Sequence, residues 1–142
     1  RVTEKSHKSK YAETIFSPLL SRDGYTFCSV ATLTGRKHQI RIHAQWIGCP
    51  LVGEKLYGKD ENIYLEFCST GWRSEWAEKL GMYRQALHGR CLTDTQSHLQ
   101  FVSTLPDDLQ DFLSSKMKLQ SQELNDLVDR ADQEFRSCLI SN

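Results

Sequence analysis

A glycine joins a β-type run to a helical run in the first third of the chain, and this junction constrains the fold more than any other feature. Tyr25–Leu33 is rich in aromatic and β-branched residues, which favours an extended strand. After Gly35, the segment Lys37–Ile47 has apolar residues at helical spacing, namely Ile40, Ala44 and Ile47. Gly48 and Pro50 end this pattern. The sequence therefore predicts a strand that bends sharply into a helix over about residues 37–47.

Two further patterns complete the predicted fold. The sequence predicts two β-hairpins, each made of two strand-like segments on either side of a turn signal. The first hairpin joins Tyr11–Ser17 to Tyr25–Leu33, and the second joins Ala86–Thr93 to Ser97–Thr104. A helix is expected around Trp72–Leu80, and from Asp107 onward the pattern is amphipathic and helical. We therefore expect an α+β fold, in which two hairpins form one predominantly antiparallel sheet with the 37–47 helix packed on it and helices at the C-terminus.

Length and composition exclude several classes of protein. The chain has 142 residues, of which 39% are hydrophobic, which is enough for one domain with a modest core. It has no long apolar run and no secretory signal pattern, so we expect a cytoplasmic protein without a membrane span. Neither its five cysteines nor its histidines have the spacing of a metal site, and its three tryptophans are more typical of packing residues than of a stacking surface.

Charge is divided unevenly along the chain. Residues 1–58 have nine Lys and Arg against four Asp and Glu, whereas residues 59–142 have nine against fourteen. Arg36, Lys37 and His38 cluster where the predicted helix begins, and the backbone N–H groups of a helix N-terminus favour an anion. These are either ordinary surface charges or a phosphate-facing corner. Arg41 lies one turn further on, where its guanidinium could hold a carboxylate through two hydrogen bonds.

Several motifs in the same order resemble the C-terminal half of the RluA-type RNA pseudouridine synthases. Thr34–His43 matches a T-G-R-x-H-Q-I-R-x-H segment. Ile47–Gly58 resembles an I-G-x-P-I-x-G-D-x-x-Y-G segment, with Glu54 in place of the usual Asp. Arg84–Gly89 resembles an R-Q-x-L-H-A motif, with Gly89 in place of the usual Ala, and Leu105–Asp108 resembles the closing segment. Since the resemblance covers roughly residues 8–113, we assign 1–113 to the C-terminal portion of such a catalytic domain and 114–142 to a helical extension.

The resemblance implies a function and roles for individual residues. It implies isomerisation of uridine to pseudouridine in structured RNA, rRNA or tRNA, without a cofactor or metal ion. Arg41 would pair with the family's nucleophilic Asp, and Leu87 would form part of the apolar wall of the base pocket. Contacts with RNA are expected from the residues Arg36, Lys37, His38, Gln39, Lys55 and Tyr57.

The nucleophile itself has no counterpart in this sequence. The family carries it in an upstream H-R-L-D segment, and no His-Arg dipeptide occurs among the 142 residues. The chain is therefore expected to be a fragment that is inactive alone, and an exposed sheet edge could lead it to self-associate. Two alternatives are a non-catalytic RNA-binding module on the same scaffold and an unrelated α+β domain whose basic helix is coincidental.

Overall fold

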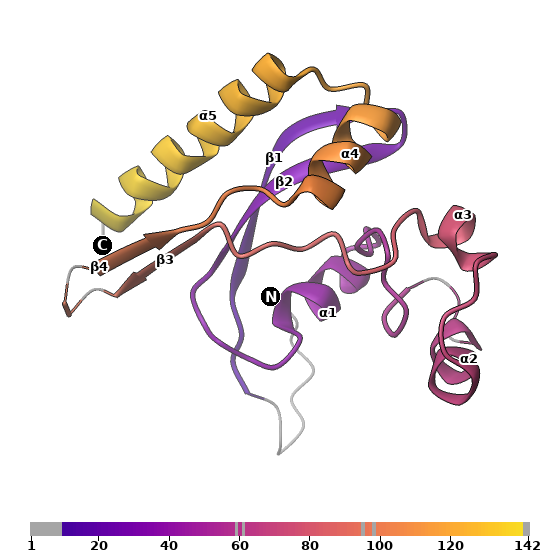
Figure 1. Ribbon diagram of the computed structural model, residues 1–142. Helices are drawn as coiled ribbons and strands as arrows, with labels where there is room; N and C mark the ends of the chain where they lie inside the picture. Colours follow the sequence, from indigo (N-terminus) through magenta and orange to yellow (C-terminus); the bar gives the residue numbers. More distant parts are fainter. Residues whose placement is uncertain (1–9, 59, 61, 95, 98, 141–142) are drawn as a thin grey trace. The chain divides into compact units, whose positions relative to one another are not determined.

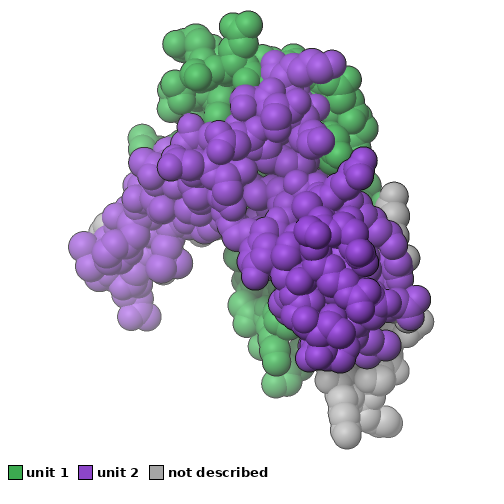
Figure 2. Space-filling view, turned by 45° about the vertical axis from the view of Figure 1, so that its right-hand side comes forward, with its two compact units in different colours: residues 1–49, 119–142 green, residues 50–118 purple. Residues whose placement is uncertain are grey.

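The computed structural model describes residues 10–58, 60, 62–94, 96–97 and 99–140, which divide between two compact units (Figure 2). Unit 1 consists of the residues up to Cys49 together with those from Leu119 onward, and unit 2 is Pro50–Lys118. Unit 2 is therefore an insertion in the sequence of unit 1. Each unit is described by itself.

Unit 1 is built on an antiparallel hairpin. Strand β1 (Thr14–Arg22) pairs with β2 (Tyr25–Thr32), and the pairing shifts register between Pro18 and Leu20. Asp23 and Gly24 form the turn, both with positive φ, the conformation that two-residue hairpin turns require. The predicted first hairpin is confirmed, although β1 begins and ends later than expected.

Helix α1 (Gln39–Trp46) follows β2, as predicted, but it begins two residues later than expected. The delay has a local cause, because His38 adopts a left-handed conformation with a φ of 56° and so caps the helix instead of joining it. The expected apolar face is only partly correct. Ala44 is buried as expected. Ile47, which was expected to be buried, is 49% exposed, whereas the polar Gln39 is buried.

Helix α5 (Ser121–Ile140) packs on β1 in unit 1 (Figure 1). The Arg22 guanidinium pairs with the Glu123 carboxylate at 2.7 Å, and an Arg130 N–H donates to the Leu19 carbonyl at 2.7 Å. Leu124 and Leu127 are buried. The predicted C-terminal helix is thus present, and its partner in the fold is the first hairpin.

Unit 2 contains three helices and a short hairpin among its described residues: α2 (Asn62–Thr70), α3 (Trp76–Leu80), β3 (Cys91–Asp94), β4 (Leu99–Val102) and α4 (Asp107–Lys116). The side chains of its core come mainly from the helices: Ile63, Trp76, Met82, Leu109, Phe112, Leu113 and Met117. Helix α2 lies in a charged segment for which the sequence predicted no helix. Among the described helices, none combines the length and the apolar character needed to cross a bilayer.

The prediction that both hairpins join in one sheet is wrong. In the described part of the chain the strands form two separate two-stranded sheets, β1–β2 in unit 1 and β3–β4 in unit 2. Alternating apolar residues show which face of a strand is buried, but they do not specify its neighbour in a sheet. The strands of the second hairpin have only four residues each, and Leu92, Leu99 and Phe101 on them are exposed.

Candidate functional site

The buried side chain of Gln39 ties the start of helix α1 to the hairpin of unit 1. Its Oε1 accepts hydrogen bonds from the Thr34 hydroxyl at 2.7 Å and from the Arg36 backbone N–H at 3.0 Å. Its Nε2 donates to the Glu13 carbonyl at 2.8 Å and to Thr14 Oγ1 at 2.9 Å. Because a backbone N–H can only donate and a carbonyl can only accept, these four contacts fix the orientation of the amide.

This arrangement assigns Gln39 a positioning role in the fold. All four hydrogen-bonding positions of the amide are used within unit 1, and the residue is 5% exposed. The predicted contact of Gln39 with RNA would require this cluster to open. Its structural effect is to hold the bend at residues 34–38, from which the basic residues extend.

Gln39→Ala should destabilise unit 1 strongly. The substitution leaves the Glu13 carbonyl and the Arg36 N–H without the amide, and we expect a loss of about 3 kcal/mol in the free energy of unfolding. Chemical denaturation followed by circular dichroism measures this loss. Gln45→Ala is the matched control, because Gln45 is an exposed glutamine on the same helix and its loss should cost under about 0.5 kcal/mol. Equal effects of the two substitutions would contradict the positioning role.

The basic residues at the bend are accessible. Arg36 and Lys37 are exposed and His38 is half-buried. Arg36 Nε donates to the Tyr11 carbonyl at 3.1 Å, so its guanidinium is held beside the start of the described hairpin. The predicted phosphate-facing corner is therefore available on the surface of unit 1, and whether RNA binds there stays a prediction.

Arg41 lies in the first turn of α1, two residues after the buried Gln39. Its side chain is half-buried, so it is neither fully solvated nor enclosed. A guanidinium in such a place is partly desolvated, and its attraction for a carboxylate is stronger there than in bulk water. The position is compatible with the predicted pairing with an aspartate, which stays a prediction.

Lys55 has surroundings that the sequence did not predict. It is 8% exposed, and its ammonium donates a hydrogen bond to the Tyr83 carbonyl. Its Nζ also lies 5.4, 5.2 and 5.5 Å from the ring centroids of Phe67, Trp72 and Tyr83. Cations are attracted to the faces of aromatic rings at such distances. The predicted contact of Lys55 with RNA stays a prediction, and it would require the ammonium to leave the rings of its own unit.

The Leu51–Tyr57 segment is held by hydrogen bonds to its own carboxylate and to residues 80–86. Glu54 is buried, and its Oε1 accepts from the backbone N–H groups of Leu56 at 3.0 Å and Tyr57 at 3.2 Å. The Gly53 N–H donates to the Leu80 carbonyl, and the Ala86 N–H donates to the Val52 carbonyl, both at 2.8 Å. Glu54 thus closes this turn, and Tyr57, which is half-buried, lies at its end.

Arg84 holds the segment that contains Leu87. Its guanidinium forms two hydrogen bonds of 2.7 Å with the Asp108 carboxylate, and its Nη1 also donates to the carbonyls of Gln85 at 3.1 Å and Leu87 at 3.0 Å. The Arg84 guanidinium lowers the pKa of Asp108 below its usual value. The pair therefore stays ionised at neutral pH and weakens only as acid protonates the carboxylate. Leu87 is half-buried, and its role in a base pocket stays a prediction.

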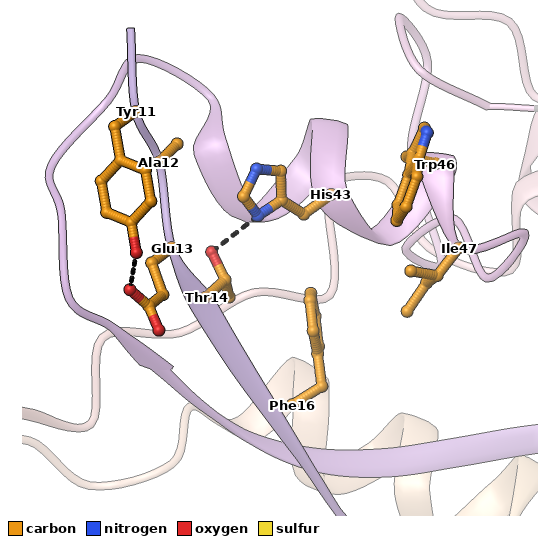
Figure 3. A pocket seen from close by; sticks show the side chains of 8 residues that line it. All are labelled: Tyr11, Ala12, Glu13, Thr14, Phe16, His43, Trp46 and Ile47. Carbon is orange, nitrogen blue, oxygen red and sulfur yellow. Dashed lines mark hydrogen bonds between the residues drawn. The ribbon is translucent and has the colours of Figure 1, made fainter. Parts of the chain in front are cut away.

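A cavity of about 190 Å³ lies between β1 and α1 in unit 1 (Figure 3). Its lining consists of Tyr11, Ala12, Glu13, Thr14, Phe16, His43, Trp46 and Ile47. No sequence pattern indicated this cavity, because its residues come from two segments about 30 positions apart. Among the described residues, no group of three or more His, Cys, Asp and Glu could hold a metal ion.

Comparisons with known proteins bear on the identity of the chain. It is 34% identical over 102 residues to an uncharacterized RNA pseudouridine synthase, YjbO, of Bacillus subtilis, which covers 69% of this chain. It is 33% identical over 103 residues to the ribosomal large subunit pseudouridine synthase D of Buchnera aphidicola, which covers 63% of this chain. The chain belongs to the RluA-type family of RNA pseudouridine synthases.

The RluA-type relatives are much longer than this chain. It spans 30% of the Bacillus protein and 29% of the Buchnera protein. The chain is also 43% identical over 54 residues to the mitochondrial tRNA pseudouridine(32) synthase of Saccharomyces cerevisiae. This shorter match covers 37% of the chain and 12% of the yeast protein. No family profile and no solved structure matches the chain.

Proposed function

We propose that residues 1–113 are the C-terminal part of the catalytic domain of an enzyme that isomerises uridine to pseudouridine in rRNA or tRNA, and that residues 114–142 are a helical extension of it. Similarity to named pseudouridine synthases over up to 69% of the chain carries this proposal. The half-buried Arg41 at the start of α1 agrees with it. We place the enzyme in the cytoplasm, which cell fractionation would test.

In the proposed reaction this chain supplies the charged guanidinium of Arg41 and the segment that carries Leu87. An aspartate starts the reaction, the N-glycosidic bond of uridine breaks, and the uracil turns and rejoins the sugar through a ring carbon. That carbon then loses its proton and the freed ring nitrogen gains one, so the product is an isomer of the substrate. Arg41 would keep that aspartate ionised and oriented, since a nearby cation lowers the pKa of a carboxyl group. Leu87 would contact the turning base from a segment that Arg84 restrains. The uridine would first leave its stack in the RNA.

The isolated chain should form no pseudouridine. We assign the nucleophile to an H-R-L-D segment, and this sequence contains none. The test incubates the chain with a structured rRNA fragment and measures pseudouridine by nucleoside chromatography. Adding a separately made segment that carries H-R-L-D should restore product. Turnover by the chain alone would overturn this assignment of the nucleophile.

RNA binding by the chain should depend strongly on salt. If Arg36 and Lys37 meet phosphates, replacing both with Ala should reduce the slope of log affinity against log salt by about 1.4, or about 0.7 per contact on single strands. Fluorescence anisotropy between low and moderate salt measures the slope. The control replaces Arg73 and Lys79, which are ion-paired in unit 2, and should leave the slope nearly unchanged. The same slope in all three proteins would remove Arg36 and Lys37 from the RNA interface.

A non-catalytic RNA-binding module is the second candidate. The lack of an H-R-L-D segment in the 142 residues favours it for this chain taken alone. Salt-dependent binding with no product after the complementing segment is added would support it. Self-association of the chain through sheet edges is a further proposal, and sedimentation velocity at several concentrations tests it.

A further inference from the structure

The cavity of unit 1 has the form of a groove between one face of β1 and one face of α1 (Figure 3). Thr14 and Phe16 are two residues apart on the strand, so their side chains lie on the same face. His43 and Trp46 are three residues apart on α1, and Ile47 is the residue that caps its C-terminus, so the three side chains also share a face. Secondary-structure geometry therefore sets this part of the groove, whereas Tyr11, Ala12 and Glu13 line the rest of it from the segment that precedes β1.

One part of the groove presents accessible apolar surface. The Trp46 side chain is 56% exposed and Ile47 is 49% exposed, and Phe16 lies on the strand opposite them. Large apolar side chains that are exposed together often mark a binding surface. A flat indole is a surface on which a planar aromatic ligand can stack.

The rest of the lining presents polar groups that hydrogen bonds hold in place. His43 Nδ1 is 2.9 Å from Thr14 Oγ1, which also accepts a hydrogen bond from the Gln39 amide. Among the described residues, the other nitrogen of the His43 ring has no hydrogen-bond partner. The Glu13 carboxylate accepts from the Tyr11 hydroxyl and has acceptor capacity left. The groove thus combines an apolar wall with a ring nitrogen and a carboxylate.

A cation accompanies the groove. Arg36 Nε donates to the carbonyl of Tyr11, which is one of the lining residues, and the exposed Lys37 follows it in the chain. A ligand with a flat apolar face, a polar edge and a phosphate complements these features. A nucleotide has all three.

We propose that this groove binds an unstacked nucleobase of single-stranded RNA, with the base against Trp46 and its phosphate toward Arg36. The choice of RNA rests on the proposed function. This base is distinct from the uridine that reacts, because Arg41 and His43 are two positions apart and so lie on different faces of α1. The groove is therefore a second site for a nucleotide of the RNA substrate.

The test compares a pentauridylate with an abasic pentamer of the same charge. Base stacking on an aromatic side chain contributes about 1 to 3 kcal/mol, so Trp46→Ala should weaken pentauridylate binding roughly 5- to 150-fold. Binding of the abasic pentamer should not change. Phe101→Ala is the matched control, because Phe101 is 62% exposed on β4 in unit 2 and should affect neither ligand.

A second measurement detects binding at the groove in the unmodified protein. The chain has three tryptophans, Trp46, Trp72 and Trp76, and nuclear magnetic resonance resolves one indole N–H signal for each. Pentauridylate should shift the Trp46 signal and leave those of the other two in place. Trp46→Phe identifies the signal.

The outcomes separate this site from the proposed function. Equal weakening of both pentamers by Trp46→Ala, or no shift of the Trp46 signal, would overturn the site while leaving salt-dependent RNA binding and turnover unaffected. A Trp46 signal that moves with protein concentration in the absence of RNA would assign the groove to a second copy of the chain and also overturn the site. Base-dependent binding without any pseudouridine formation in the complemented system would retain the site and contradict the enzyme.

Discussion

Gly53→Ala should unfold unit 2 or bring it close to unfolding, with a loss of more than about 4 kcal/mol in the free energy of unfolding. A Cβ at Gly53 would lie 1.9 Å from the Arg84 carbonyl oxygen and 2.7 Å from its carbon. Both atoms belong to the backbone, so a change of side-chain rotamer cannot relieve the overlap. Gly53 also has a φ of 74°, which residues with a Cβ rarely adopt.

The wider effect follows from the hydrogen bonds around Gly53. Its N–H donates to the Leu80 carbonyl, and the neighbouring Val52 carbonyl accepts from Ala86. Separating these two segments would therefore also disturb the Arg84 segment that carries Leu87. Thermal unfolding and hydrogen exchange of residues 80–87 measure the change.

Gly89→Ala is the matched control for Gly53→Ala. A Cβ at Gly89 would meet no atom within 4 Å, and Ala is the residue usually found there in the RluA-type motif. We expect no loss of stability, and a small gain from the reduced flexibility of the unfolded chain. Comparable losses from Gly53→Ala and Gly89→Ala would show that the close approach to Arg84 does not restrict position 53.

Arg41→Ala should reduce turnover of the complemented enzyme by about two orders of magnitude or more, the scale of removing one preorganised group from an active site. RNA affinity should fall far less, because the proposed partner of Arg41 is the aspartate and not a phosphate. Single-turnover kinetics together with a binding titration separate the two effects. Arg41→Lys keeps the charge without the two-pronged guanidinium and should recover part of the rate.

The control for Arg41 is Arg36→Ala, for which we expect the opposite pattern. Arg36 is exposed at the bend, so its loss should weaken RNA binding. The rate at which bound RNA is converted to product should change little. If Arg41→Ala lowers affinity and rate equally, Arg41 is a binding residue. Unchanged kinetics for Arg41→Ala would remove it from the site altogether.

Local patterns predicted the parts of the fold that local geometry determines. Asp23 and Gly24 predicted the first hairpin because a tight turn needs positive φ at both positions. Gly48, which also has positive φ, marked the end of α1. The later start of the helix depends on a left-handed His38, a conformation that a histidine adopts only occasionally, so no pattern indicated it.

Burial of polar side chains could not be predicted in the same way. The resemblance to the RluA-type family led us to expect Gln39 and Lys55 at the RNA interface, and both side chains are buried. Each is satisfied by groups distant in the sequence: Gln39 by the Glu13 carbonyl, and Lys55 by the rings of Phe67 and Tyr83. Hydrophobic periodicity contains no information about such partners. For the same reason it gave no sign of the groove beside Trp46.

The interrupted course of unit 1 has a consequence for biosynthesis. A ribosome releases Pro50–Lys118 before the residues of α5, whereas the first hairpin leaves before both. Domains usually fold as they emerge from the ribosome. Unit 2 can therefore fold before the contacts of β1 with Glu123 and Arg130 have formed. During that interval the nascent hairpin exposes the face that α5 later covers, which makes it a stage at which chaperones can act.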